Sequence, residues 1–253
     1  MPTSYENIRI AGGDTATPLA MGKRLRIIKR HLRPEDRRFL DCGCGAGEYV
    51  LALLDQFGLD AHGIEFDEGK VRHAHQKPVL VQRVARGDLE SLQFGDASWD
   101  YVMVNEVLEH VPDERRALAE IARVLKTNGT LFVFSPNRWF PFETHGVHWR
   151  RSGHRVPHWV PFVPYVPLRF GQRVFDYWAR NYWQDELANL VQSHGFTLLE
   201  RAYVWQTFEG ISGKQPWLIS TLKPGLRWIS NTLESLPGLR RFGVSQVLVG
   251  RKR

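Results

Sequence analysis

A run of glycines at alternate positions marks the stretch of this chain best suited to hold a ligand. The pattern D-x-G-x-G-x-G runs from Asp41 through Gly43 and Gly45 to Gly47. A short apolar run precedes it and an apolar-periodic stretch follows, which is typical of a strand, a tight turn and a helix. Glycine is needed where the backbone reaches positive φ or where a ligand lies against the main chain. The free N–H groups of the helix N-terminus then face that ligand.

A second candidate group ends the next apolar stretch. Residues 60 to 65 predict a strand that finishes in the carboxylate of Glu65. A carboxylate at the tip of a second strand can accept hydrogen bonds from both ribose hydroxyls of a nucleoside. Glu65 is therefore the candidate ribose ligand, and Phe66 would lie beside the base.

The third candidate group follows the predicted strand 98–105. Glu106, Glu109 and His110 have i, i+3, i+4 spacing, which on a helix would place them on one face. Histidine is the side chain best suited to remove a proton near pH 7, so His110 is the candidate general base. A structural role for His110, and a divalent cation held by the three side chains, are the alternatives. We predict no metal. His145 and His148, further along, are secondary candidates for the base.

The glycine turn separates two classes of cofactor. The dinucleotide fingerprint G-x-G-x-x-G/A requires a small residue at position 48, and Glu48 stands there. The turn instead resembles that of the class I S-adenosylmethionine-dependent methyltransferases. The stretches SWDYVMVNEVLEHVPD (98–113) and RVLKTNGTLFVFSPN (123–137) resemble the small-molecule branch of that family, to which ubiquinone-biosynthesis O-methyltransferases belong.

The resemblance implies roles for individual residues. The glycine turn would pass beneath the methionine part of S-adenosylmethionine, and Asp41 would help to hold its amino group. Asp88 would accept the adenine amino hydrogen, with the backbone N–H of Leu89 beside it. The full set of expected cofactor contacts is Asp41, Gly43, Cys44, Gly45, Gly47, Glu65, Phe66, Asp88, Leu89, Asn105 and Glu106.

Alternating apolar stretches predict an α/β fold. Expected strands end at Leu40 and cover 60–65, 79–84, 98–105, 130–134, 197–204 and 244–249, and helices lie between them. Thr17-Pro18 predicts a helix start, Asp67 and Asp113 are expected N-caps, and Gly129 is the expected end of the helix that begins at Asp113. The resemblance implies a Rossmann-like sheet of seven mostly parallel strands with helices on both faces. The strand order would be 3-2-1-4-5-7-6, with the last strand antiparallel. We expect one domain over 1–253, with its core at about 35–135, 184–204 and 244–250.

Two insertions interrupt this core. Residues 136–183, after the fifth strand, are rich in tryptophan, arginine and proline, and proline spacing over 159–167 favours extended chain. This insertion is either a substrate lid or membrane-surface element, or a structural cap on the sheet edge. Residues 206–242 are basic and predict a short amphipathic helix over 224–236. We rank an anionic or lipid-linked acceptor above nucleic acid, because no nucleic-acid-binding module is recognisable.

The composition and the two cysteines indicate the compartment in which the protein is expected. The 253 residues are 43% hydrophobic with a net charge of +7, which indicates a globular, moderately basic protein. Cys42 and Cys44 are too close in sequence for an unstrained disulfide, so we expect thiols in a reducing compartment. The expected location is the cytoplasm, with peripheral contact to a membrane.

The sequence therefore predicts an S-adenosylmethionine-dependent methyltransferase that acts on a small-molecule or lipid-linked acceptor, at oxygen. Two alternatives stay open. A non-catalytic S-adenosylmethionine-binding module would keep the same cofactor residues. A nicotinamide-dependent oxidoreductase is disfavoured by Glu48.

Overall fold

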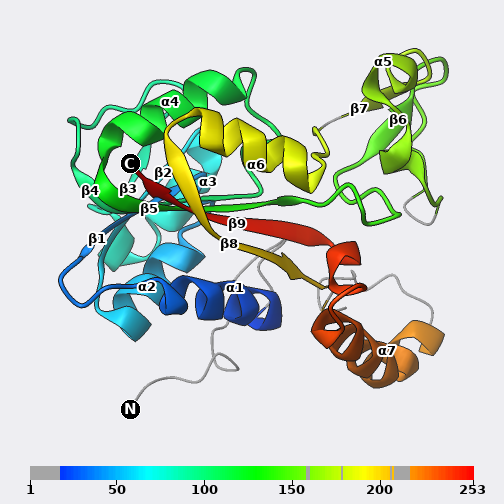
Figure 1. Cartoon of the computed structure of the whole chain (residues 1–253), viewed down its shortest axis with the longest axis horizontal. Helices are drawn as coiled ribbons and strands as arrows, with labels where there is room; N and C mark the ends of the chain where they lie inside the picture. Colours follow the sequence, from blue (N-terminus) through cyan, green and yellow to red (C-terminus); the bar gives the residue numbers. More distant parts are fainter. Residues whose placement is uncertain (1–17, 158–159, 178, 206, 208–216) are drawn as a thin grey trace.

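A seven-stranded sheet forms the centre of the molecule (Figure 1). The structure is a computed structural model that describes residues 18–157, 160–177, 179–205, 207 and 217–253. The strand order is β3-β2-β1-β4-β5-β9-β8. The strands are β1 (Arg38–Cys42), β2 (Asp60–Glu65), β3 (Val84–Arg86), β4 (Trp99–Asn105), β5 (Leu125–Pro136), β8 (Phe196–Val204) and β9 (Ser245–Lys252). β1 to β5 are parallel and β9 is antiparallel to both neighbours, so the expected topology is confirmed.

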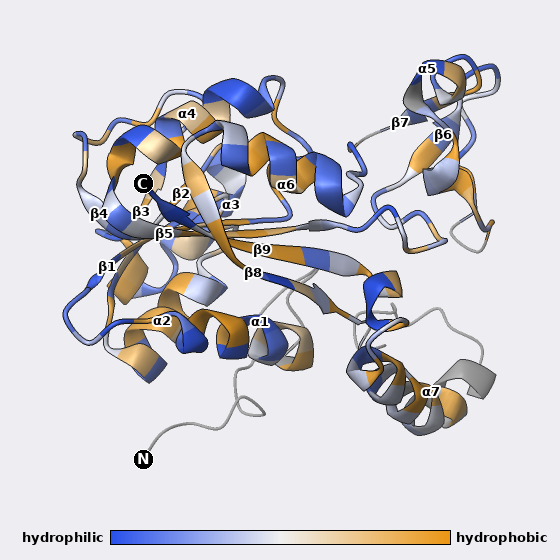
Figure 2. Ribbon diagram, in the orientation of Figure 1, coloured by the Kyte–Doolittle hydropathy of each residue, from blue (hydrophilic) through white to orange (hydrophobic). Residues whose placement is uncertain are grey.

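Helices cover both faces of this sheet, and Figure 2 shows how their hydrophobic residues are distributed. One apolar core lies beneath α1 (Pro18–Arg30), α2 (Glu48–Phe57) and α3 (Glu68–Ala74). A second lies beneath α4 (Glu114–Val124) and α6 (Gln184–Ser193). Burial of these cores fixes the strands from both sides, which leaves their carboxyl ends free to build a site.

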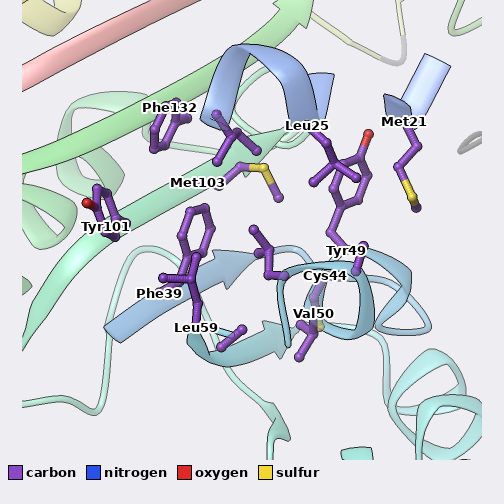
Figure 3. Close-up of a cluster of buried hydrophobic side chains, with 14 of the residues drawn as sticks. Met21, Leu25, Phe39, Cys44, Tyr49, Val50, Leu59, Tyr101, Met103 and Phe132 are labelled. Atoms are coloured by element: carbon purple, nitrogen blue, oxygen red, sulfur yellow. The ribbon is translucent and has the colours of Figure 1, made fainter. Parts of the chain in front are cut away.

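Aromatic side chains from neighbouring strands fill the first core (Figure 3). Phe39 of β1 stacks between Tyr101 of β4 and Phe132 of β5, with ring centroids 5.7 and 6.0 Å away. All three side chains are fully buried. This packing holds β1 in register beside β4 and thereby positions the turn that follows β1.

Local signals set several of the element ends. Asp113 caps α4 as expected, because its carboxylate accepts hydrogen bonds from the backbone N–H groups of Arg115 and Arg116. Asp67 likewise caps α3 by accepting from the N–H of Lys70. α1 begins at Pro18, as predicted, and its expected cap Thr17 lies outside the described residues.

The predicted third strand is wrong over most of its length. Residues expected to be extended over 79–84 instead include a short 3₁₀ helix, η2 (Pro78–Leu80), and β3 begins only at Val84. Proline fixes φ near the helical value and is favoured at the first position of such a turn. Leu80 is buried against Gly47, whereas Val79 and Val81 are exposed, so the alternation imitates that of a strand.

The predicted helix end at Gly129 is also wrong. α4 ends at Val124, and Leu125 already pairs with Trp99 as part of β5. The left-handed residue is Asn128, with φ 63°. Gly129 is needed for another reason: a Cβ there would lie 2.8 Å from the carbonyl oxygen of Lys126.

The first insertion folds into a small unit that we call the insertion lobe (residues 147–177). It contains the antiparallel pair β6 (Val147–Trp149) and β7 (Phe175–Tyr177), the 3₁₀ helix η3 (Val163–Tyr165) and α5 (Leu168–Gly171). Three buried valines, at 147, 156 and 163, form its own core. The guanidinium of the buried Arg138 tethers the lobe by donating to the carbonyl oxygens of Pro164 and Val166.

The second insertion is dominated by α7 (Trp217–Ser235), which starts earlier than the expected 224–236 and carries Pro224 inside it. The short helix η4 (Arg240–Phe242) leads from it into β9. Among the described residues, no helix has both the length and the apolar character needed to cross a membrane.

Candidate active site

A cavity of about 1040 Å³ opens at the carboxyl ends of β1, β2 and β4. It is the place that the sequence predicts for a ligand in a parallel sheet. Expected site residues that line it are Asp41, Gly43, Cys44, Gly45, Glu65, Phe66, Asp88, Leu89, Asn105, Glu106 and His110. Gly47 does not line it. Of the described residues in the first insertion, His145 alone reaches the cavity.

The three glycines of the turn have different tasks although all have positive φ. A Cβ at Gly43 would lie 2.3 Å from Val107, and one at Gly47 would lie 2.5 Å from Leu80. These two positions need glycine for close packing inside the protein. A Cβ at Gly45 would meet nothing within 4 Å, because Gly45 faces the open cavity. Gly45 is therefore the position where a ligand can lie against the backbone.

Asp41 ends β1 beneath this turn and is 1% exposed. Its Oδ1 atom is buried and has no hydrogen-bond partner in the described part of the chain. Burial, followed by the charges of Glu65 and Glu48, raises the pKa of Asp41 to about 8. A buried carboxyl with a vacant acceptor atom at a cavity wall fits a ligand that brings a positive charge.

Glu65 is tied into the glycine turn by both carboxylate oxygens. Its Oε2 accepts from the N–H of Gly45 at 2.9 Å, and its Oε1 accepts from the N–H of Asp67 at 3.0 Å. Each carboxylate oxygen can accept a second hydrogen bond, so the group retains capacity for hydroxyl donors. Phe66 beside it is 67% exposed and offers a bare ring at the cavity wall.

The residues that follow β3 form the wall of the cavity where an adenine is expected to lie. The Oδ1 atom of Asp88 accepts from the N–H of Glu90 at 2.9 Å, which fixes the orientation of its carboxylate. Leu89 is buried beneath the cavity. Asn105, at the end of β4, has a buried Oδ1 without a hydrogen-bond partner among the described residues. These groups can bind a nucleoside whose ribose lies near Glu65.

Glu106 and His110 do not lie on a helix, contrary to the sequence-based expectation. Residues 106–113 form a turn, and Glu106 has φ 56°. The carboxylate of Glu106 is bound by the buried Arg24 of α1 at 2.8 Å and by the hydroxyl of Ser245 of β9. Two segments far away in sequence thus position Glu106, and neither was predicted to do so.

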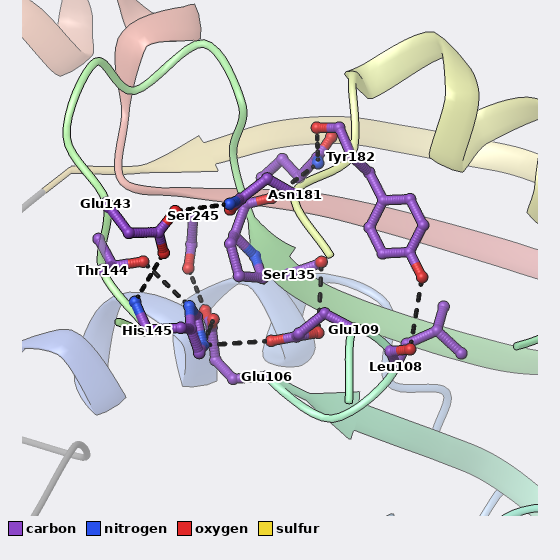
Figure 4. A network of polar contacts seen from close by, with 12 residues as sticks. Glu106, Leu108, Glu109, Ser135, Glu143, Thr144, His145, Asn181, Tyr182 and Ser245 are labelled. Atoms are coloured by element: carbon purple, nitrogen blue, oxygen red, sulfur yellow. Dashed lines mark hydrogen bonds and ion pairs between the residues drawn. The ribbon is translucent and has the colours of Figure 1, made fainter. Parts of the chain in front are cut away.

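His145 meets both glutamates of this turn (Figure 4). Its Nε2 lies 3.6 Å from Oε2 of Glu106 and 3.5 Å from Oε1 of Glu109. The hydroxyl of Ser135 donates to the other oxygen of Glu109 at 3.4 Å. Burial, together with the charge of Glu106, raises the pKa of Glu109 well above its usual range. Glu109 therefore keeps its proton to a higher pH than an exposed glutamate.

The donor set available to a cation differs from Glu106, Glu109 and His110, the set that the sequence offered as an alternative to having no metal. Within the described residues, ligand atoms of Glu109, His110 and His145 lie within 4.8 Å of one another, and the two histidine rings are 5.1 Å apart. Glu106, which the sequence grouped with Glu109 and His110, is instead engaged by Arg24. Two imidazoles and a carboxylate suit a transition metal better than Mg²⁺.

Sequence reasoning gave little weight to His145 and none to Arg24. His145 follows β5 and was one of several histidines in the insertion, and Arg24 lies among the basic residues of α1. No spacing pattern connects either residue to the turn at 106–110. Only the packing of α1 and of the insertion brings them to the cavity.

Part of the chain is similar in sequence to known methyltransferases. Residues 40–133 match a family model described as a methyltransferase domain. A probable S-adenosylmethionine-dependent methyltransferase of Mycobacterium tuberculosis is 34% identical over 118 residues, which is 46% of this chain and 42% of that protein. A demethylmenaquinone methyltransferase of Staphylococcus aureus is 34% identical over 110 residues, which is 42% of this chain and 46% of that protein. The chain thus matches less than half the length of these relatives.

Solved structures share the fold over nearly the whole chain at low identity. A possible histamine N-methyltransferase of Thermotoga maritima has a TM-score of 0.56 and 21% identity, covering 93% of this chain and 89% of its own. A methyltransferase crystallised with the Trm112 activator of Haloferax volcanii has a TM-score of 0.58 and 21% identity, covering 90% and 87%. The [4+2]-cyclase SpnF has a TM-score of 0.57 and 20% identity, covering 96% and 84%.

Proposed function

We propose that the chain is a class I S-adenosylmethionine-dependent methyltransferase and that it methylates an oxygen of a small-molecule or lipid-linked acceptor. One observation carries the proposal. A single cavity of about 1040 Å³ is lined by all of the expected cofactor-binding residues except Gly47, and also by His110 and His145, which can accept a proton.

Residues along the cofactor half of the cavity could bind the parts of S-adenosylmethionine in the order in which these parts are bonded to one another. Asp41 would accept from the amino group, whose positive charge would favour the carboxylate and lower the raised pKa of Asp41. Gly45 would leave room for the methionine chain, and Glu65 would accept from the ribose hydroxyls. Asp88 and Leu89 would hold the adenine.

The acceptor half is lined by His110 and His145, and Glu109 is buried beside His145. When bound, the cofactor supplies an electrophilic methyl group on a sulfonium. His110 would take the proton of an acceptor hydroxyl as its oxygen bonds to the methyl carbon and the carbon–sulfur electron pair goes to sulfur.

The names of relatives support a small-molecule acceptor in general terms. The relative from Staphylococcus aureus is named for demethylmenaquinone. The fold itself does not decide the reaction, because the cyclase SpnF shares it. We propose oxygen as the acceptor atom because of the histidines. A hydroxyl must lose its proton to react well, so it depends on a base more than a reactive carbon or an amine does.

A turnover assay tests the proposal. The protein is incubated with S-adenosylmethionine and fractions of a metabolite extract, and formation of S-adenosylhomocysteine is followed together with methylated product. We expect turnover with at least one fraction, and methyl ether or ester formation in its product. Binding of S-adenosylhomocysteine without turnover in any fraction would support a non-catalytic module. Binding of NADH in preference to S-adenosylhomocysteine would support an oxidoreductase.

A further inference from the structure

We infer that α7 and the insertion lobe together form a surface that binds an anionic lipid bilayer. Figure 1 shows both elements at the same end of the molecule, the end toward which β5 runs. The inference goes beyond methyl transfer and does not depend on it, so each can fail alone.

The first observation is an apolar stripe along α7. Leu222, Leu226, Ile229 and Leu233 follow one another at spacings of four and three residues, which places them on one side of the helix, and Leu236 follows directly after the helix ends. Leu222, Ile229 and Leu236 are exposed, and the other two are only partly buried. A helix of this length is about 28 Å long, so the stripe is a substantial exposed apolar strip.

Aromatic residues extend the apolar character at both elements. Trp228, on a different side of α7 from the stripe, is 70% exposed. Phe162, Phe170 and Trp149 are exposed on the lobe. Tryptophan and phenylalanine with one side in water are typical of membrane interfaces, where the ring lies at the level of the headgroups.

The second observation is a strong excess of positive charge around these apolar residues. The lobe exposes five arginines against one acidic residue: Arg150, Arg151, Arg155, Arg169 and Arg173 against Asp176. Asp176 already pairs with Arg150, at 3.5 Å. Arg240 and Arg241 are exposed in η4, which follows α7. Guanidinium groups beside exposed apolar side chains complement a layer of lipid phosphates over an apolar interior.

A bilayer fits this charge better than a second copy of the chain. Pairing of two copies through α7 and the lobe would bring arginines against arginines without acidic partners, which is unfavourable. Nucleic acid would satisfy the arginines but would leave the leucine and isoleucine stripe of α7 in water. An anionic bilayer satisfies both kinds of residue at once.

The segment that leads into the lobe contacts the segment that follows α7, which connects the two elements indirectly. The side-chain amide of Asn137, at the start of the first insertion, donates to the carbonyl oxygens of Arg241 and Gly243, each at 2.7 Å. The ring of Trp139 contacts that of Phe242, with centroids 5.9 Å apart. His145, which lines the cavity, lies two positions before β6 of the lobe. The lobe therefore begins two residues after a side chain that lines the acceptor side of the cavity.

Flotation with vesicles tests the inference on the full chain. We expect binding to vesicles of phosphatidylcholine mixed with phosphatidylglycerol, and weaker binding to phosphatidylcholine alone or in high salt. Ile229→Glu should weaken binding on the order of tenfold or more, because it places a charge in the apolar stripe. The pair Arg169→Glu and Arg173→Glu should weaken it by at least about fivefold per arginine, and only on vesicles that contain phosphatidylglycerol.

Ser235→Glu is the matched control, because it adds the same charge to an exposed position of α7 outside the stripe. It should bind vesicles like the unaltered protein. Circular dichroism and thermal melts of all variants check that they are folded. The inference is overturned if the unaltered protein does not float with either vesicle, or if Ile229→Glu and Ser235→Glu behave alike. It is also overturned if Ile229→Glu converts a lipid-free dimer into a monomer, or if the protein binds RNA in preference to vesicles and Ile229→Glu leaves that binding unchanged.

Discussion

Gly45 and Glu106 lie on the same cavity and are held in place over very different distances in sequence. The N–H of Gly45 is bound by Glu65, 20 positions away. The carboxylate of Glu106 is bound by Arg24 and Ser245, 82 and 139 positions away. The glycine turn is thus held by short-range contacts within one continuous segment, whereas the turn that carries Glu106 and the proposed base His110 is held by the helix before the sheet, the last strand and an insertion.

This difference predicts that changes on the two sides separate cofactor binding from turnover. A cofactor-side change should alter affinity for S-adenosylhomocysteine. An acceptor-side change should lower turnover with that affinity unchanged.

The largest effect is expected at Gly45. Gly45→Val puts a branched side chain into the space where the cofactor would lie, at φ 57°. Binding of S-adenosylhomocysteine should fall below detection in calorimetry. Gly58→Val is the matched control, because Gly58 has φ 60° and equally open space but ends α2 away from the cavity. Both variants should lose about 1–2 kcal/mol of stability from backbone strain. A folded Gly45→Val protein with unchanged affinity would contradict the role of the turn.

The next largest effect is expected at His110. His110→Gln removes the proposed base and should lower kcat on the order of 10²–10⁴-fold, the usual contribution of general base catalysis. Affinity for S-adenosylhomocysteine should not change, since the cofactor contacts lie elsewhere. His148→Gln, in β6 of the lobe, is the control and should keep full turnover. If both substitutions lower kcat equally, His110 is not the base.

Glu65→Ala should weaken the binding of S-adenosylmethionine by about 1.5–3 kcal/mol, the range for hydrogen bonds to a charged group. The loss includes the support that Glu65 gives to the N–H of Gly45 and of Asp67. Glu68→Ala removes an exposed carboxylate three positions further on, 3.7 Å from Arg86, and serves as the control. Calorimetry measures both, and equal dissociation constants for Glu65→Ala and the unaltered protein would exclude Glu65 as the ribose acceptor.

The raised pKa of Asp41 predicts that the affinity for the cofactor depends on pH. Its pKa is about 8 without ligand, and a bound ammonium group would stabilise the carboxylate and lower that pKa. Binding below pH 8 should then release a proton, and affinity should rise with pH by up to about tenfold per unit until about pH 8. Calorimetry in two buffers of different ionisation enthalpy measures the release. Asp41→Asn should abolish it, whereas Asp55→Asn, on the exposed side of α2, should not. Equal proton release by Asp41→Asn would show that the ligand's own amino group is its source.

The sequence was informative where short-range rules apply. Alternating glycines, strand-tip carboxylates and the cap at Asp113 are local patterns, and the structure places the glycine turn, Glu65 and Asp88 around one cavity. Short-range rules also explain the errors. Val79 and Val81 alternate with Leu80 as in a strand, although Pro78 starts a 3₁₀ helix there. Glu106, Glu109 and His110 have helical spacing but lie in a turn.

The acceptor side could not be predicted in the same way. Arg24 reaches Glu106 only because α1 packs on the sheet, and His145 reaches Glu109 only through the path of the chain after β5. The sequence suggested a lid over residues 137–180, yet in the described part of that segment His145 alone lines the cavity. Long-range packing of this kind leaves no periodic signal in the chain.

The smallest effect on chemistry is expected from removing the insertion lobe. Val147 and Tyr177 are paired at the base of the β6–β7 ribbon, so a short Gly-Ser linker can replace residues 148–176. Arg138→Met is included, because the guanidinium of Arg138 would otherwise lose its acceptors in the lobe while buried. Since the lobe has its own core, the sheet should stay folded.

Affinity for S-adenosylhomocysteine and turnover on a water-soluble acceptor should then change little, because His145 is retained, whereas binding to anionic vesicles should weaken strongly. Arg138→Met alone is the control. Thermal melts, calorimetry and flotation on the two proteins distinguish the alternatives. Unfolding or loss of cofactor affinity would mean that the lobe caps the core. Loss of turnover with the fold and the cofactor site intact would mean that the lobe does form part of the acceptor wall, and the division between a chemical cavity and a separate membrane surface would have to be abandoned.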